Sequence, residues 1–131
     1  MDWRYGAAFL ASVILASLAD WVFAGVLFHN RYQAHPEVWR FTGANPKALA
    51  AAQALTIPTV VGMIGLIVWG HHTALIESLT LASLVWMTAA APAIIANGIY
   101  IKLHPLIVAS HTIGWLVKLG LVAGATALIL S

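Results

Sequence analysis

Four long apolar stretches dominate the chain and leave little choice of fold. Each has at least the roughly 20 mostly apolar residues that a helix needs to cross the hydrocarbon core of a bilayer. They run from about residue 5 to 28, 47 to 69, 73 to 99 and 105 to 130. Closed β-barrels, the other way to cross a membrane, need segments that alternate in polarity, and these stretches do not alternate. The sequence therefore predicts a single domain over residues 1–131, an all-α integral membrane bundle of four antiparallel transmembrane helices.

The composition favours lipid over water as the solvent of this chain. Of its 131 residues, 62% are hydrophobic and 8% are charged, whereas soluble domains carry about 25% charged residues. The first stretch is about 24 residues long, well beyond the roughly 7–15 residues of a signal-peptide core, so we expect a retained span. The absence of cysteine excludes disulfides and thiolate metal sites. The formal charge of +2, without a long basic run, does not favour nucleic-acid binding.

The connections predict the topology and the orientation. Residues 70–72 and 100–104 are tight links, and only residues 29–46 have room for structure, with one or two helical turns expected from Pro36 to Phe41. The side with residues 29–46 and 100–104 carries four basic residues and the side with both termini carries one. These are Arg31, Arg40, Lys47 and Lys102 against Arg4. The positive-inside rule then predicts that residues 29–46 lie in the cytoplasm and both termini outside. We expect the membrane to be a bacterial inner membrane.

Small residues mark where helices can approach closely, which is what drives helix association in lipid. Ser12 and Ala16 belong to a ridge of small residues in the first stretch, and Gly120 and Gly124 form a GxxxG spacing in the fourth. One interpretation is packing inside a single four-helix bundle. The other is that Gly120 and Gly124 form a face for a second copy or a foreign subunit. Pro58 and Pro92 are each expected to bend their helix because proline removes a backbone hydrogen bond.

Ionisable side chains inside a span are costly and usually face the protein interior. Asp20, His111 and Lys118 are such residues, and Asn97 is expected at the same depth. At the helical rise, Asp20 and His111 lie about 12 and 9 Å from the expected cytoplasmic edge, and Lys118 about 20 Å from it. If the first and fourth stretches touch, the group forms an ion pair that fixes helix register or a proton-responsive site. Which group pairs with Asp20 stays open at this point.

Other chemistry finds no support in the sequence. His71, His72 and Glu77 do not share one helix face, although a metal would need about three converging ligands. A haem held by His111 with His29 or His104 would lack any attachment motif. No Ser-His-Asp order, HExxH motif or phosphate-binding glycine loop is present. We therefore expect no catalytic residue, no metal and no cofactor.

Several short motifs resemble a small bacterial family of four-span membrane proteins that is known only as a domain of unknown function. They are Trp21, Gly25, Leu27-Phe28, Trp39, Trp86 and Gly114-Trp115. The resemblance covers nearly the whole chain and implies the same four-span fold. It implies no activity and assigns no role to any residue.

The function expected from the sequence is that of a non-enzymatic small polytopic membrane protein acting through association. Its partner is another membrane protein, as for a subunit or assembly factor, or a second copy in a homo-oligomer. The alternative is a small transporter or ion- or proton-responsive protein that uses Asp20, His111 and Lys118.

Overall fold

The computed structural model describes residues 2–38, 40 and 45–131. The described residues form helices without any strand. In chain order these are α1 (Trp3–Asp20), the π-helical η1 (Trp21–Leu27), α2 (His29–Gln33), the 3₁₀ turn η2 (Pro36–Val38), α3 (Pro46–Ala54), α4 (Thr56–Trp69), α5 (Leu75–Val85), the π-helical η3 (Trp86–Ala90), α6 (Ala91–Tyr100) and α7 (Pro105–Leu130). The fold is all-α, as predicted.

These helices join into four rods that are long and apolar enough to cross a membrane. The rods are Trp3–Leu27, Pro46–Trp69, Leu75–Tyr100 and Pro105–Leu130, close to the expected boundaries. We call them spans. Of the turns expected between Pro36 and Phe41, η2 is present, whereas Trp39 and Phe41 lie outside the described residues.

Local chemistry starts the helices where the sequence indicates. Asn45 caps α3 by accepting a hydrogen bond from the Ala48 backbone N–H at 3.0 Å, and Pro46 occupies the first turn. At the start of α7, His104 is the capping residue and Pro105 occupies the first turn. A capping side chain satisfies one of the backbone N–H groups that a helix start leaves without a partner.

The two prolines explain two interruptions of the spans. Pro58 cannot donate to the Ala54 carbonyl, and the second span breaks there, between α3 and α4 at Leu55. Pro92 cannot donate to the Thr88 carbonyl, and the preceding turn widens into η3, with the Ala91 N–H bonded to Trp86 O. A third irregularity, η1, begins directly after Asp20. No proline accounts for it.

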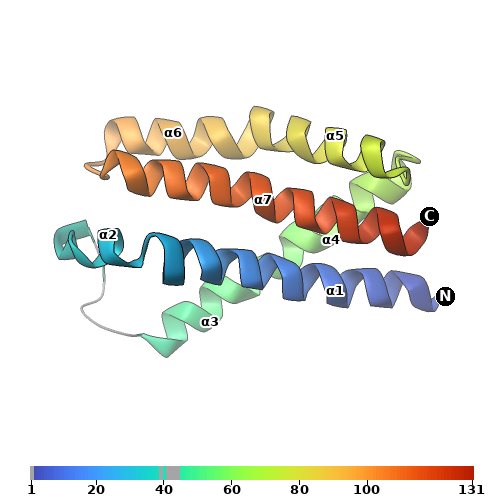
Figure 1. Cartoon of the computed structure of the whole chain (residues 1–131), viewed down its shortest axis with the longest axis horizontal. Coiled ribbons are helices and arrows are strands. Elements are labelled where there is room, and N and C mark those ends of the chain that lie inside the picture. The colour runs from blue at the N-terminus through green and yellow to red at the C-terminus, as the bar shows by residue number, and fades with distance from the viewer. Residues whose placement is uncertain (1, 39, 41–44) are drawn as a thin grey trace.

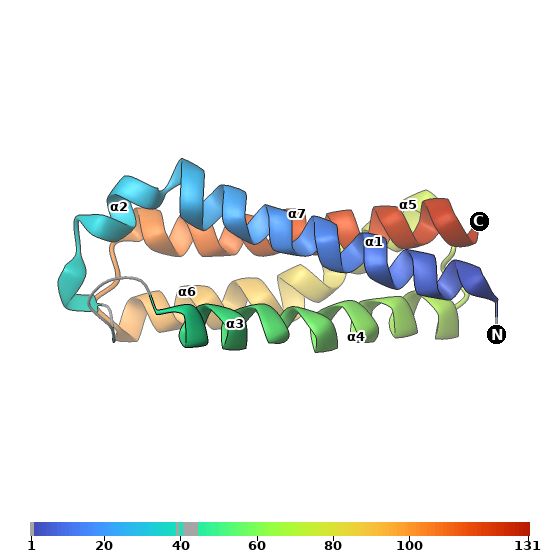
Figure 2. The same ribbon diagram turned by 90° about the horizontal axis from the view of Figure 1, so that it is seen from below.

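The spans are arranged around α7. Figure 1 shows α7 between α1 on one side and the α5–η3–α6 span on the other, with α3 and α4 crossing behind them. α4 adjoins α5 at one end, and α3 diverges from α6 toward the other, while Figure 2 shows the same bundle from below. Both termini lie at one end of the bundle, where the Arg4 side chain donates to the Ile129 carbonyl at 2.7 Å. The positive side chain therefore neutralises the carbonyl end of α7.

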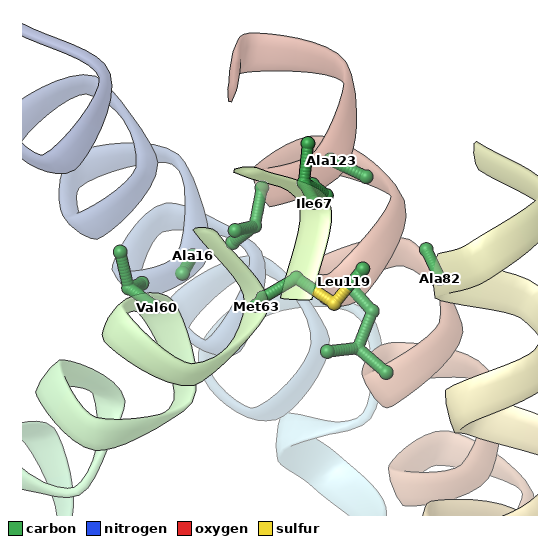
Figure 3. Close-up of a cluster of buried hydrophobic side chains, with 8 residues drawn as sticks. Ala16, Val60, Met63, Ile67, Ala82, Leu119 and Ala123 are labelled. Atoms are coloured by element: carbon green, nitrogen blue, oxygen red, sulfur yellow. The ribbon is translucent and has the colours of Figure 1, made fainter. Parts of the chain in front are cut away.

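One core cluster joins all four spans (Figure 3). Its members are Ala16 of the first span, Val60, Met63 and Ile67 of the second, Ala82 of the third, and Leu119, Val122 and Ala123 of the fourth. The small residues permit close backbone approach between α1 and α7. Ser12 and Ala16 are both 0% exposed, so this half of the predicted helix interface lies inside the chain.

Ser12 is the residue of this interface that is expected to lower the stability of the fold. Its hydroxyl is buried without a hydrogen-bond partner in the described part of the chain. A buried polar group that lacks a partner costs about 1–3 kcal/mol. We expect Ser12→Ala to raise the free energy of unfolding by about 1 kcal/mol, as measured by titration with SDS in mixed micelles. Ser83→Ala is the matched control, because the exposed Ser83 hydroxyl is bonded to Leu79 O, and it should change little. A loss of stability in Ser12→Ala would mean that the hydroxyl has a partner.

Candidate functional site

The most deeply placed charged group is an ion pair between the first and last spans. The Lys118 ammonium on α7 donates to Asp20 Oδ2 at the end of α1, with an Nζ–Oδ2 distance of 2.6 Å. The side chain of Lys118 is 6% exposed and that of Asp20 is 37% exposed. Lysine points toward the start of its own helix, which brings its ammonium group from mid-span to the level of Asp20. The two charges neutralise each other where a single charge would be expensive.

Two further side chains contact the same ammonium group. Thr56 Oγ1, at the first residue of α4, lies 3.3 Å from Lys118 Nζ and is itself 1% exposed. The ring of Trp115, one turn before Lys118, has its centroid 5.0 Å from Nζ, within the range of a cation–π interaction. The ammonium group thus has a charged, a hydroxyl and an aromatic partner from three helices. Thr56 was not identified from the sequence as a partner of Lys118. Pro58, which interrupts the span beside Thr56, was the one feature of the sequence that pointed to this place.

His111 belongs to a second contact, nearer the start of α7. Its Nε2 lies 3.0 Å from the hydroxyl of Tyr32 on α2, and the two rings meet edge to face. Tyr32 is 6% exposed. Burial raises the pKa of the Tyr32 phenol, and a hydrogen bond with the Ser110 hydroxyl acts in the opposite direction. Tyr32 therefore attaches the short helix α2 to α7, a role that its place in a loop did not reveal.

The predicted polar group is only partly brought together. Asp20 and Lys118 are in direct contact, and Asp20 is close enough to His111 to interact with it electrostatically. Asn97 does not join this contact, because its side chain is exposed on α6 and, among the described residues, no hydrogen bond links it to the other three. The reason is the rotation of α6 about its own axis. Gly98 faces Val108 of α7, so the adjacent Asn97 faces away from α7. It therefore also faces away from α1, which lies on the other side of α7 (Figure 1).

The second half of the predicted helix interface is open. A Cβ atom added to Gly120 or Gly124 would meet no atom within 4 Å, apart from the neighbouring backbone of its own helix. The GxxxG spacing therefore does not pack tightly against another described span of this chain.

A lateral groove with a volume of about 490 Å³ lies between α4 and the η3–α6 segment. Small residues form much of its walls: Gly62 on α4, Ala89 and Ala90 on η3, and Ala93 on α6. Trp115 and Leu119 of α7 form part of its lining. The irregular turn before Pro92 thus contributes directly to the groove.

The remaining histidines lie near the loops. His35 Nδ1 is 3.1 Å from Glu37 Oε1, and its ring stacks on His104 with the centroids 5.0 Å apart. His72 Nδ1 and Glu77 Oε2 are 3.9 Å apart and both side chains are largely exposed. Among the described residues, no three His, Asp or Glu side chains converge on a point where a metal ion could bind.

Fold and site together define an all-α multi-pass bundle whose four spans are long and apolar enough to cross a membrane, with a charged pair among them. No protein-family model, no curated protein and no solved structure matches this chain. The resemblance based on Trp21 and Gly114-Trp115 therefore stays a prediction.

Proposed function

We propose that this protein is a non-enzymatic, small polytopic protein of the bacterial inner membrane that acts by associating with another membrane-spanning chain. It serves as a subunit or assembly factor of a larger complex, or forms a homo-oligomer. The groove between α4 and the η3–α6 segment carries this proposal. Residues 29–46 face the cytoplasm and both termini face outside, which the distribution of basic residues supports.

The groove has the properties of a helix-docking surface in lipid. Apolar packing alone does not distinguish a protein partner from lipid, so helix association depends on small residues that allow close backbone approach. Gly62, Ala89, Ala90 and Ala93 present such a surface on one side of the bundle. A Cβ atom added at Gly62 would meet nothing within 4 Å, so a partner helix has room to approach this backbone.

Native mass spectrometry from a mild detergent tests the proposal. We expect the intact chain to carry added mass from a second protein or a second copy, and Gly62→Leu to reduce this assembly at least about tenfold, which corresponds to about 1.4 kcal/mol. Gly65→Leu is the matched control, because Gly65 lies on the same helix with equally open space but in a separate depression against α1.

Two results would contradict parts of this proposal. A bare monomer for the unmodified chain, without any co-purified protein, would contradict the association proposal. Loss of assembly in Gly124→Leu but not in Gly62→Leu would move the interface from the groove to the open Gly120/Gly124 ridge.

A further inference from the structure

A series of polar side chains leads from α2 toward the middle of the bundle, and their exposure falls from His111 inward. Tyr32 of α2 bonds to His111, which is exposed on α7. Asp20 follows with a 37% exposed side chain, and Lys118 is 6% exposed. Exposure therefore decreases from His111 through Asp20 to Lys118.

In the opposite direction, the interface between α1 and α7 is buried. Between the ion pair and the termini, Ser12, Ala16, Val122 and Thr126 are all 0% exposed. The Thr126 hydroxyl donates to the Val122 carbonyl of its own helix at 2.7 Å, and among the described residues the Ser12 hydroxyl has no hydrogen-bond partner. The polar series stops at Lys118 and does not cross the bundle.

The exposed part of Asp20 favours water over hydrocarbon as its surroundings. A carboxylate that faced hydrocarbon would be costly, so ionisable groups within a span face the protein interior or a hydrated cavity. Lys118 covers Oδ2, and the α1–α7 interface toward the termini is buried. Water that enters from the α2 end would hydrate the exposed carboxylate oxygen and so lower the cost of placing this charge within a span.

We propose that Asp20 is a proton-binding site reached from the α2 end past Tyr32 and His111, with Lys118 as its resident counter-charge. One proton leaves water at that end and forms an O–H bond on the Asp20 carboxylate. Lys118 keeps its three protons, the Nζ–Oδ2 ion pair is lost, and the site gains one positive charge. Thr56 Oγ1 and the Trp115 ring remain as partners of the ammonium group. The inference does not depend on the proposed association.

The surroundings contain few competing titratable groups. The adjoining segments α4, η1 and η3 have none. α2 carries His29, Arg31 and Tyr32, α5 carries Glu77, and α6 carries Tyr100. Of these, only Tyr32 is buried, while the others are exposed near helix ends. His111 and Lys118 are the titratable groups of α7, and Lys118 contacts Asp20 directly.

Infrared difference spectroscopy on the full chain in liposomes measures this protonation directly after an acid step. Asp2 and Asp20 are the two aspartates of the chain, so ¹³C-aspartate labelling in an Asp2→Asn background isolates Asp20. We expect a carboxylic acid C=O band that shifts with the label and is lost in Asp20→Asn. The band should rise at least about tenfold more slowly in His111→Phe, in line with the contribution of a positioned proton carrier. Tyr32→Phe should slow it in the same direction.

Ser12→Ala is the matched control on the buried side toward the termini and should leave the rate unchanged, and the amide I band shows that each variant remains folded. The absence of any labelled acid band in the Asp2→Asn protein would overturn the proposal. An acid band that rises at the same rate in His111→Phe as in Ser12→Ala would overturn the route. A purely structural ion pair would give no acid band in any variant.

Discussion

Asp20→Asn lowers the free energy of unfolding by about 2 kcal/mol, because it leaves the buried Lys118 ammonium without its counter-charge. Removing one partner of a buried pair typically costs about 3–5 kcal/mol. The expected loss is smaller here because Thr56 and Trp115 still contact the ammonium group. Lys118→Met should cost less, since the Asp20 side chain is 37% exposed and keeps part of its hydration.

The double variant Asp20→Asn/Lys118→Met gives the sharper result. Replacing both charges removes the unpaired group, so its stability should lie within about 1 kcal/mol of the unmodified chain. The measurement is a double-mutant cycle from SDS titrations in mixed micelles. If the two single losses simply add in the double variant, Asp20 and Lys118 do not form the ion pair.

Gly98→Ala is expected to destabilise the packing of α6 against α7 by about 1–2 kcal/mol, within the range of about 1–3 kcal/mol for overpacking. The added Cβ atom would lie 2.5 Å from Val108 Cγ2 and 3.2 Å from its Cγ1. A β-branched side chain on a helix has one strongly preferred rotamer, so Val108 cannot rotate away. This cost exceeds the gain that alanine brings to a helix over glycine, which is about 1 kcal/mol at most.

Two further variants test that explanation by the same SDS titration. Val108→Ala should rescue Gly98→Ala, because it removes the two methyl groups that the new Cβ atom meets. Gly62→Ala introduces the same atom into open space and should be neutral or mildly stabilising. Equal losses in Gly98→Ala and Gly62→Ala would show that the contact with Val108 is not the cause.

The spans could be predicted because their signals are local. Length, apolar composition, the Asn45 cap and the prolines act within a few residues of where they stand. Pro58 and Pro92 are found beside the α3–α4 break and the η3 segment. By contrast, η1 has no proline, and nothing local to Trp21–Leu27 indicated a π-helical segment there.

The site was predictable only as a set of candidates. The cost of a charge in lipid singled out Asp20 and Lys118 as candidates. Only the way in which α1 and α7 are each turned about their own axes brings Asp20 Oδ2 to 2.6 Å from Lys118 Nζ. The same kind of rotation excluded Asn97, since the contact between Gly98 and Val108 sets which face α6 presents. Thr56 and Tyr32 carry common side chains whose importance depends wholly on what lies beside them.

The sequence by itself determined the fold class, the number of spans and the residues that cannot face hydrocarbon, because lipid imposes those constraints on each helix separately. The tertiary structure decided how the helices are turned and where they leave space. It joined Asp20 to Lys118, attached α2 to α7 through Tyr32, left the Gly120/Gly124 ridge open and formed the groove beside Gly62. These features arise from packing between helices far apart in the chain, and such packing depends on the rotation of each helix about its axis, which hydrophobic composition leaves free.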